Sequence, residues 1–203
     1  MAAHWNFPRY EGHIIHVQTT SNCDSVELWV NTTSVGRRKT ADYINNTIIW
    51  YVPYKTGKIS AKGFNNGKEV AQFELKTSGK PSKILVLPDK QELNANGEDL
   101  SHITIQLADE NGVVVPDADQ TITVELTGSG RLLGLDNGDL RKEIYGGKAV
   151  KTYFGTALAT VQASRTKGDI QIKVSSPGLP ASLITLKANG IHKNGKNQTQ
   201  YAF

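Results

Sequence analysis

Carboxylate pairs are the residues of this 203-residue sequence that come nearest to hydrolytic chemistry. A hydrolase needs a matched acid and base in one pocket. The nearest pairs are Asp117 with Asp119 and Asp136 with Asp139. Both pairs stand beside Pro or Gly, where an Asp side chain can accept a hydrogen bond from its own backbone and stabilise a turn. We therefore interpret these residues as turn-forming and predict no catalytic residue in the chain.

Metal ligands and activated nucleophiles are poorly represented. Asp136, Asn137 and Asp139 offer oxygen atoms that suit calcium, but the loop lacks the ligand count of a dedicated calcium site. The five histidines have no ligand-like spacing, and Cys23 is the single thiol, so neither zinc nor a disulfide is expected. A serine nucleophile would need a Gly-x-Ser-x-Gly elbow, which the sequence lacks. The sequence predicts no cofactor, with calcium at this loop left as an alternative.

Aromatic side chains are the third group, because sugar rings dock their apolar C–H faces on exposed Trp and Tyr. Trp50 falls on the same face of its expected strand as the apolar residues around it, so it is predicted to lie in a core. Trp29 and Tyr51 fall on the face of their strands opposite to the apolar residues, so they are predicted to face outward. Trp5 and Phe7 are expected to pack on an upstream domain. For Trp29, domain contact, partial burial and sugar binding all remain open, and Tyr51 is a candidate of the same kind.

The elements that position these residues are predicted to be β-strands. Apolar residues alternate with polar ones, and no long amphipathic helix is indicated. Asn65, Asn66 and Gly67 form a strong hairpin turn, since Asn and Gly tolerate positive φ. The expected strands cover 14–17, 25–30, 35–38, 47–52, 58–64, 69–76, 84–87, 103–107, 122–126, 157–163, 170–174 and 183–186.

The spacing of these strands predicts an all-β chain of two tandem immunoglobulin-like β-sandwich domains. A Gly/Pro/Ser joint falls at residues 78–82, where the strand pattern begins again. We expect one sandwich over 1–79, a linker at 80–82 and a second sandwich over 83–188. Residues 189–203, rich in Asn, Gln, Lys and Gly, are expected to form a flexible tail.

Composition limits the partners. Hydrophobic residues make up 38% and charged residues 21%, which fits a folded soluble protein and no membrane span. The formal charge is +4, and Lys and Arg are scattered along the chain, so a nucleic-acid partner is not expected. The start has no signal-peptide pattern, and Met1 is the single methionine. Either the protein is cytoplasmic or this start is artificial, and a single Met at position 1 suits an initiator placed before an excised fragment.

Two ordered sets of motifs resemble the C-terminal modules of family-two glycoside hydrolases, the β-galactosidase-like enzymes of Bacteroidetes. The first set is similar to a domain with the motifs HWNW, VELFLNGKSLG and W-x-VPY. It consists of His4 to Phe7, Ser25 to Asn31 and Ile49 to Tyr54. Phe7 replaces the last Trp of the opening motif, and the turn from Asn31 to Ser34 departs from NGKS.

The second set is similar to the last module of the same enzymes, in which VPDAD precedes GVDNGD and FNGLAL. Its segments are Leu100 to Ile105, Val115 to Asp119, Gly134 to Asp139 and Phe154 to Leu158. The resemblance runs from about His4 to Ala188. It implies a fragment of an enzyme whose reaction takes place on an upstream (β/α)₈ barrel with two carboxylates.

The resemblance thus implies a non-catalytic accessory region that packs on or positions that barrel, its partner in the same polypeptide, in a periplasmic or extracellular glycosidase. The alternative is a carbohydrate-binding module that tethers the enzyme to a polysaccharide. Trp5, Phe7, Trp29 and Tyr51 are the candidate interface or sugar contacts under either hypothesis.

Overall fold

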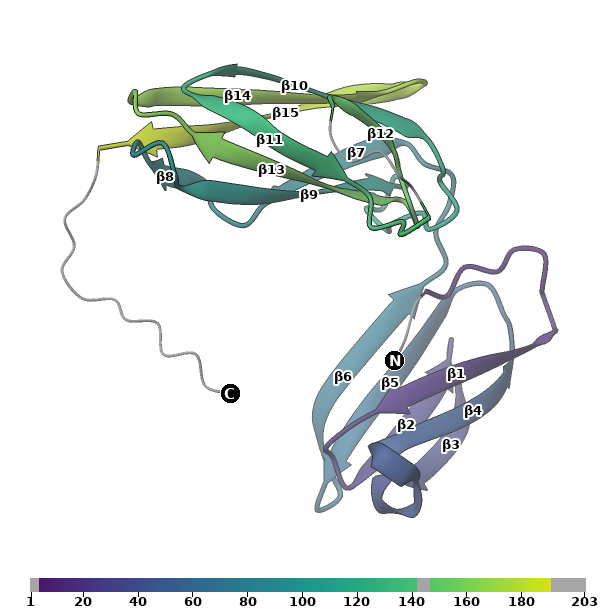
Figure 1. The fold of residues 1–203 in the computed structure, drawn as a ribbon. Helices are drawn as coiled ribbons and strands as arrows, with labels where there is room; N and C mark the ends of the chain where they lie inside the picture. Colours follow the sequence, from purple (N-terminus) through teal and green to yellow (C-terminus); the bar gives the residue numbers. More distant parts are fainter. Residues whose placement is uncertain (1–3, 142–146, 191–203) are drawn as a thin grey trace. The chain divides into compact units, whose positions relative to one another are not determined.

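The structure, a computed structural model, describes residues 4–141 and 147–190. The chain divides into two compact units, Met1–Gly79 and Lys80–Phe203. Both are built from strands, and the helices in the described ranges are two single 3₁₀ turns, η1 (Thr40–Asp42) and η2 (Ile44–Asn46) (Figure 1). Neither turn has the length or apolar character to cross a membrane. The predicted all-β class is confirmed, and the immunoglobulin-like assignment is compatible with it.

Unit 1 packs a two-stranded sheet against a four-stranded one, and all its strand pairs are antiparallel. The small sheet has the order β1-β4, and the large sheet has the order β3-β2-β5-β6. The strands are β1 (Ile14–Thr20), β2 (Ser25–Val30), β3 (Thr33–Lys39), β4 (Thr47–Pro53), β5 (Lys58–Asn65) and β6 (Lys68–Lys76). The predicted hairpin turn joins β5 to β6, with Asn66 and Gly67 both at positive φ.

The core of unit 1 follows from strand alternation. Leu28, Ile48 and Trp50 are fully buried, each on the inner face of its strand. The indole Nε1 of Trp50 donates a hydrogen bond to the hydroxyl of Thr19 at 2.9 Å, which satisfies its one polar atom inside the core. The guanidinium of Arg38 lies 4.4 Å from the ring centroid of Trp50. The predicted core position of Trp50 is confirmed.

Trp5 requires a correction, because its side chain is only 1% exposed within unit 1 itself. Its Nε1 donates to the carbonyl oxygen of Lys55 at 2.9 Å, and its ring lies 4.9 Å from that of Tyr54. The hydroxyl of Thr77 donates to the carbonyl oxygen of Trp5 at 2.8 Å. Phe7 is half-buried against the same cluster. The segment before β1 therefore completes this core, and Trp5 offers no surface to an upstream domain.

Unit 2 stacks a five-stranded sheet, in the order β12-β10-β14-β15-β8, on a four-stranded sheet, in the order β11-β13-β9-β7 (Figure 1). The strands are β7 (Lys83–Pro88), β8 (Glu92–Asn94), β9 (Leu100–Ala108), β10 (Thr121–Gly128), β11 (Gly130–Asp136), β12 (Ala149–Lys151), β13 (Thr156–Ala163), β14 (Gly168–Ser176) and β15 (Leu179–Asn189). Strands β8, β11 and β12 were not predicted. Asn189, assigned to a tail by the sequence, ends β15, and residues 191–203 lie outside the described part of the chain.

The core of unit 2 is aliphatic and lies between its two sheets. Ile103, Ile105 and Leu107 on β9 have no exposed surface, and neither do Ile170 and Ile172 on β14. Strand β13, next to β9 in the same sheet, adds the small buried residues Ala157, Ala159 and Ala163 to this core. Packing of alternate side chains therefore stabilises this unit, as in other two-layer β proteins.

A half-buried carboxylate, that of Asp99, secures the loop between β8 and β9. Asp99 is 17% exposed and accepts hydrogen bonds from the backbone N–H groups of Asn94 at 2.9 Å and Leu100 at 3.0 Å, and from the ammonium of Lys90 at 3.2 Å. Burial alone would raise the pKa of Asp99, but these donors favour the charged form and lower it below its ordinary value.

Replacing Trp5 by Ala should destabilise unit 1 by about 3–5 kcal/mol, since it removes a fully buried aromatic ring. Chemical denaturation that resolves the two units should show the transition of unit 1 shifted and that of unit 2 unchanged. Tyr51, which is 61% exposed, provides the matched control. Its replacement by Ala should leave both transitions in place, and an equal loss from the two variants would contradict the assignment of Trp5 to the core.

Replacing Asp99 by Asn should destabilise unit 2 at neutral pH by roughly 1.5–3 kcal/mol, the range for hydrogen bonds to a charged group. Because the folded pKa is lowered, this stabilisation is present above the unfolded pKa and is lost as pH falls through the folded pKa. Urea unfolding at neutral and at acidic pH should show the gap between wild type and variant closing in acid. A gap that widens in acid would refute this account.

Candidate functional site

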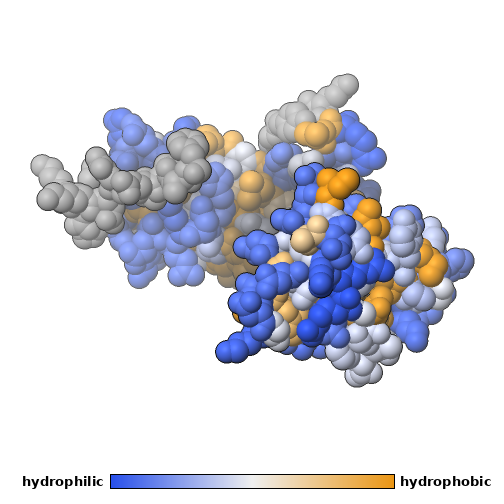
Figure 2. Space-filling view, turned by 90° about the horizontal axis from the view of Figure 1, so that it is seen from below, coloured by the Kyte–Doolittle hydropathy of each residue, from blue (hydrophilic) through white to orange (hydrophobic). Residues whose placement is uncertain are grey.

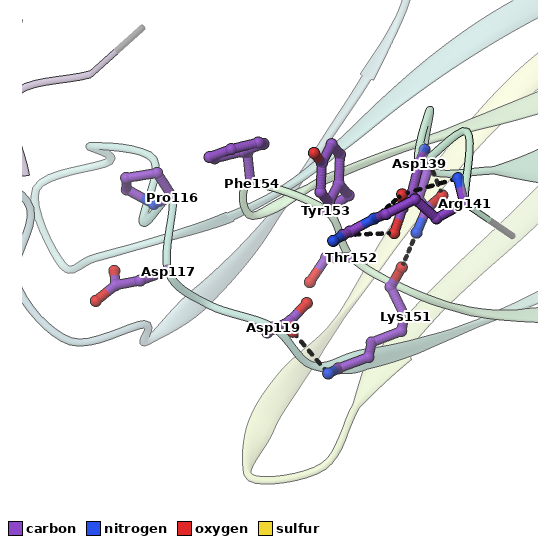
Figure 3. A pocket seen from close by; sticks show the side chains of 10 residues that line it. Pro116, Asp117, Asp119, Asp139, Arg141, Lys151, Thr152, Tyr153 and Phe154 are labelled. Carbon is purple, nitrogen blue, oxygen red and sulfur yellow. Dashed lines mark hydrogen bonds and ion pairs between the residues drawn. The ribbon is translucent and has the colours of Figure 1, made fainter.

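One end of unit 2 carries a pocket of about 490 Å³, formed where three loops meet (Figure 3). The loop before β10 contributes Pro116, Asp117 and Asp119, and the segment after β11 contributes Asn137, Asp139 and Arg141. The third part runs from Lys151, the last residue of β12, to Phe154 before β13. This volume lies within the ~300–1,000 Å³ range of small-molecule pockets.

The floor of the pocket is tied together by hydrogen bonds. The buried hydroxyl of Thr152 donates to the carbonyl oxygen of Ala118 at 2.6 Å and accepts from the backbone N–H of Gln120 at 3.1 Å. The side-chain amide of Asn137 donates to the carbonyl oxygen of Lys151 at 2.8 Å. Because Thr152 and Asn137 each join two of the three segments, the pocket has a fixed base.

The charged groups of the pocket are arranged as two ion pairs. Asp119 lies 2.6 Å from the ammonium of Lys151, and the guanidinium of Arg141 donates to both carboxylate oxygens of Asp139 at 2.8 and 3.0 Å. The hydrogen bonds to Asp139 raise the pKa of Arg141, which stays protonated. Figure 3 shows Asp119 directed toward Lys151, and Asp117 directed away from both pairs. Asp119 and Asp139 are thus each engaged by a cation of the pocket itself.

Two aromatic rings form a wall of the pocket. The ring centroids of Tyr153 and Phe154 lie 4.6 Å apart with 67° between the ring planes. Phe154 is 56% exposed, while Tyr153 is half-buried and has the guanidinium of Arg141 at 5.6 Å from its ring centroid. The pocket therefore places apolar ring faces beside planar charged groups.

The calcium alternative at Asp136, Asn137 and Asp139 finds no support in the geometry. The side-chain oxygens accept hydrogen bonds from nearby backbone N–H groups, from Asn137 to Asp136 at 2.7 Å and from Asp139 to Asn137 at 3.0 Å. Asp139 is further engaged by Arg141. Over residues 4–141 and 147–190, no group of three or more His, Cys, Asp or Glu side chains could hold a metal ion.

A Ser, a His and an Asp do lie together at the start of β9, but not in the arrangement of a nucleophilic triad. The hydroxyl of Ser101 donates to Asp89 at 3.1 Å and to the carbonyl oxygen of Lys90 at 2.9 Å, and Ser101 is fully buried. His102 contacts the same carboxylate, with its Nδ1 3.3 Å from Asp89. A triad requires the His to accept the proton of the Ser hydroxyl. Here Ser101 and His102 share one acceptor instead.

In unit 1, Trp29 lies on the outer face of β2, as predicted, but is half-buried there. Its neighbour Glu27 accepts hydrogen bonds from Arg37 and from the hydroxyl of Ser34, both at 2.9 Å. The bond from Arg37, with that from Ser34, lowers the pKa of Glu27 despite the opposing effect of burial. Among the roles left open for Trp29, the structure favours partial burial beside this ion pair.

Tyr51 belongs to an exposed apolar face on the outer side of β1 and β4, which we call the β1–β4 face and define by Ile14, His16, Ile49, Tyr51 and Pro53. Ile14 is 55%, Ile49 41% and Tyr51 61% exposed. The register pairs His16 with Tyr51 and Ile14 with Pro53, and the rings of His16 and Tyr51 lie 4.6 Å apart. Figure 2 shows one side of the molecule, where hydrophobic side chains reach a mainly hydrophilic surface. The β1–β4 face is therefore an exposed apolar surface of the kind that binds a partner.

The sequence did not indicate Arg141, Lys151 or Tyr153 as site residues. They come from segments that are separated in the chain by other elements, and strand alternation does not encode how loops converge. The signal that was present is the aromatic pair Tyr153 and Phe154 directly before Gly155, because large aromatic residues are unusual at a tight turn. Two all-β units of packed sheets define the class of this chain, a β-sandwich region.

Comparison with known proteins identifies the family to which this region belongs. Residues 84–185 match the family described as glycoside hydrolase family 2 C-terminal domain 5, and residues 12–71 match a domain of unknown function, DUF4982. The β-galactosidase BoGH2A of Bacteroides ovatus is 32% identical over 188 residues, which are 91% of this chain and 22% of that protein. The chain belongs to glycoside hydrolase family 2, where it corresponds to the C-terminal domains.

Solved structures agree with this assignment. A glycosyl hydrolase family 2 member from Bacteroides cellulosilyticus matches with a TM-score of 0.85 and 35% identity, over 92% of this chain and 24% of that one. A β-glycosidase from Bacteroides vulgatus matches with a TM-score of 0.86 and 30% identity, also over 92% and 24%. The chain thus spans less than a quarter of the length of each of these relatives.

Because each of these pocket carboxylates is paired with a cation and neither faces a second carboxylate as an acid–base partner, the 203-residue chain should not release nitrophenol from 4-nitrophenyl β-D-galactopyranoside above the buffer rate. Asp119→Asn and Asp139→Asn should give the same result in a continuous absorbance assay. Release that depends on either carboxylate would overturn the assignment of a non-catalytic region.

Proposed function

We propose that this chain is the accessory C-terminal region of a β-galactosidase-like glycoside hydrolase, and that it packs on and positions an upstream catalytic barrel of the same polypeptide. Its family membership supports the proposal, as does the small share of each relative that it covers. The name of the relative from Bacteroides ovatus suggests β-galactosides as the substrate class of the longer protein.

The observation that carries the packing role is the β1–β4 face. A two-stranded sheet that buries one side in its own core normally exposes polar side chains on the other. Here Ile14, Ile49 and Tyr51 are exposed instead. Covering such side chains stabilises an interface by about 25 cal/mol for each Å² of apolar surface removed from water. The upstream barrel is the proposed occupant, since most of the length of the relatives lies outside this region.

Tyr51→Asp tests this role in the longer polypeptide, where a carboxylate would be forced into the proposed interface. We expect the catalytic part to lose roughly 2–4 kcal/mol of stabilisation, the scale on which an unpaired polar group resists burial. Differential scanning calorimetry should record the loss, while the isolated 203-residue chain with the same substitution should unfold as the wild type does.

Val70→Asp is the matched control, because Val70 is 55% exposed on β6, outside the β1–β4 face. It should leave the longer protein unchanged. If Tyr51→Asp and Val70→Asp have equal effects, or if Tyr51→Asp has none, the β1–β4 face does not contact the barrel.

A further inference from the structure

Unit 1 is an incomplete sandwich on the side of β6. Its small sheet has two strands and its large sheet has four, so part of the large sheet has no layer opposite it. The register places Leu28, Ala61 and Phe73 side by side on β2, β5 and β6, and directly opposite residues share one face of a sheet. Leu28 is fully buried, Ala61 is half-buried, and Phe73 is 51% exposed. The inner face of the large sheet is therefore left uncovered at β6.

A groove of about 130 Å³ lies at this uncovered margin. One wall is the end of β1, with Thr19 and Thr20, and the other wall comes from β5 and β6 and includes Ala61, Ala71 and Phe73. The volume is well below the ~300 Å³ at which small-molecule pockets begin. A strand on one side and an apolar sheet margin on the other suit an extended polypeptide instead.

The outer edge of β4 is protected, and it faces away from this groove. The guanidinium of Arg38, on β3 at the opposite margin of the large sheet, donates to the carbonyl oxygen of Ile49 on β4 at 2.7 Å. A charged side chain at an edge strand prevents a further strand from pairing there. Since β4 lies toward β3, the outer edge of β1 lies toward β6 and the groove.

The pairing of β1 with β4 shows which backbone groups point to that outer edge. The N–H of Tyr54 donates to the carbonyl oxygen of His13 at 2.8 Å, and the N–H of Ser21 donates to that of Asn46 at 3.2 Å, at the two ends of the ladder. Hydrogen-bonded and non-hydrogen-bonded pairs alternate along an antiparallel ladder. The odd-numbered residues of β1 therefore bond to β4, and the even-numbered residues direct their N–H and C=O groups outward.

The outward groups of β1 form an open edge. Within the described part of the chain, β4 is the strand that pairs with β1, so the backbone N–H and C=O of His16 and Gln18 have no strand beside them. The strand contains no Lys, Arg, Asp, Glu or Pro, and its register runs without a bulge. These are the devices that usually protect an edge from pairing.

We propose that one extended strand completes the small sheet at this edge, and that it comes from the part of the longer polypeptide directly before this region. Its backbone would exchange hydrogen bonds with His16 and Gln18, while alternate apolar side chains would cover Phe73. This mode of binding requires an open strand edge and a pocket for alternate side chains, and β1 and the groove provide both.

The position of Trp5 supports this source for the strand. The carbonyl oxygen of Trp5 accepts a hydrogen bond from the hydroxyl of Thr77, directly after β6, and its ring contacts Tyr54, which pairs with the residue before β1. The chain at Trp5 therefore lies where β1 begins and β6 ends. A segment that reaches Trp5 along the groove runs antiparallel to β1, as a third strand of this antiparallel sheet would.

A second copy of the chain fits the edge less well than a single strand. In a twofold pairing of β1 with β1, the uncovered margin of β6 in each copy would project into space that the other copy's unit 1 already fills. One strand occupies only the layer beside β1. The proposal rests on the proposed function only in placing this region in a longer polypeptide, as in its relatives, and it does not require the barrel to contact the β1–β4 face.

Amide hydrogen exchange tests the proposal by comparing the 203-residue chain with the longer polypeptide, using mass spectrometry that resolves single residues. The N–H groups of His16 and Gln18 should exchange at least tenfold more slowly in the longer polypeptide, whereas that of Val17, bonded to β4, should be slow in both. Tyr51→Asp should keep this protection, which distinguishes a failure here from a failure of the packing role. Equal exchange of His16 and Gln18 in the two proteins would overturn the proposal. Protection in the 203-residue chain that rises with its concentration would indicate a second copy and overturn it too.

Gln18→Pro removes one donor from the open edge and no hydrogen bond from the β1–β4 ladder. In the longer polypeptide, His16 should then exchange as fast as it does in the 203-residue chain. Gln18→Ala is the matched control, because it removes the same side chain but keeps the N–H, and it should retain the protection. Both variants of the 203-residue chain should unfold at the temperature of the wild type. Equal protection of His16 in the two variants would contradict strand pairing, and the comparison of the wild-type proteins decides the proposal if Gln18→Pro does not fold.

Discussion

Side-chain alternation along β-strands is the constraint on which both units depend. Successive residues point to opposite faces, so each strand can give one set of side chains to a core and must leave the other set for solvent or a partner. In unit 2 the apolar set of β9 and β14 fills the space between two sheets. Charged side chains are therefore confined to strand ends and outer faces. The pocket and the β1–β4 face occur where this constraint allows them.

The same constraint explains how much of the fold could be predicted from the sequence. Alternation located the longer strands and placed Trp50 correctly, because these features depend on neighbours in the chain. Strand β11 was missed because Gly130 and Gly134 obscure its pattern, and β12 because three residues give no period. Trp5 was misplaced since it lies outside any strand, and its burial comes from the fold-back of the segment before β1 onto Lys55 and Tyr54.

The candidate pocket was predictable only in its parts. Asp119 and Asp139 lie in loops outside the strands, but the sequence could not show that these loops meet or that each carboxylate has a cation beside it. Such pairings depend on the three-dimensional course of loops, which carry no periodic pattern. The buried hydroxyl of Thr152 joins two of these loops, and no sequence pattern indicates this role either.

Membership of glycoside hydrolase family 2 and the absence of an acid–base pair in the described pocket are compatible, because the chain covers less than a quarter of its relatives. In the described pocket, Asp119 and Lys151 form an ion pair that joins two of its three segments, which is a structural use of charge.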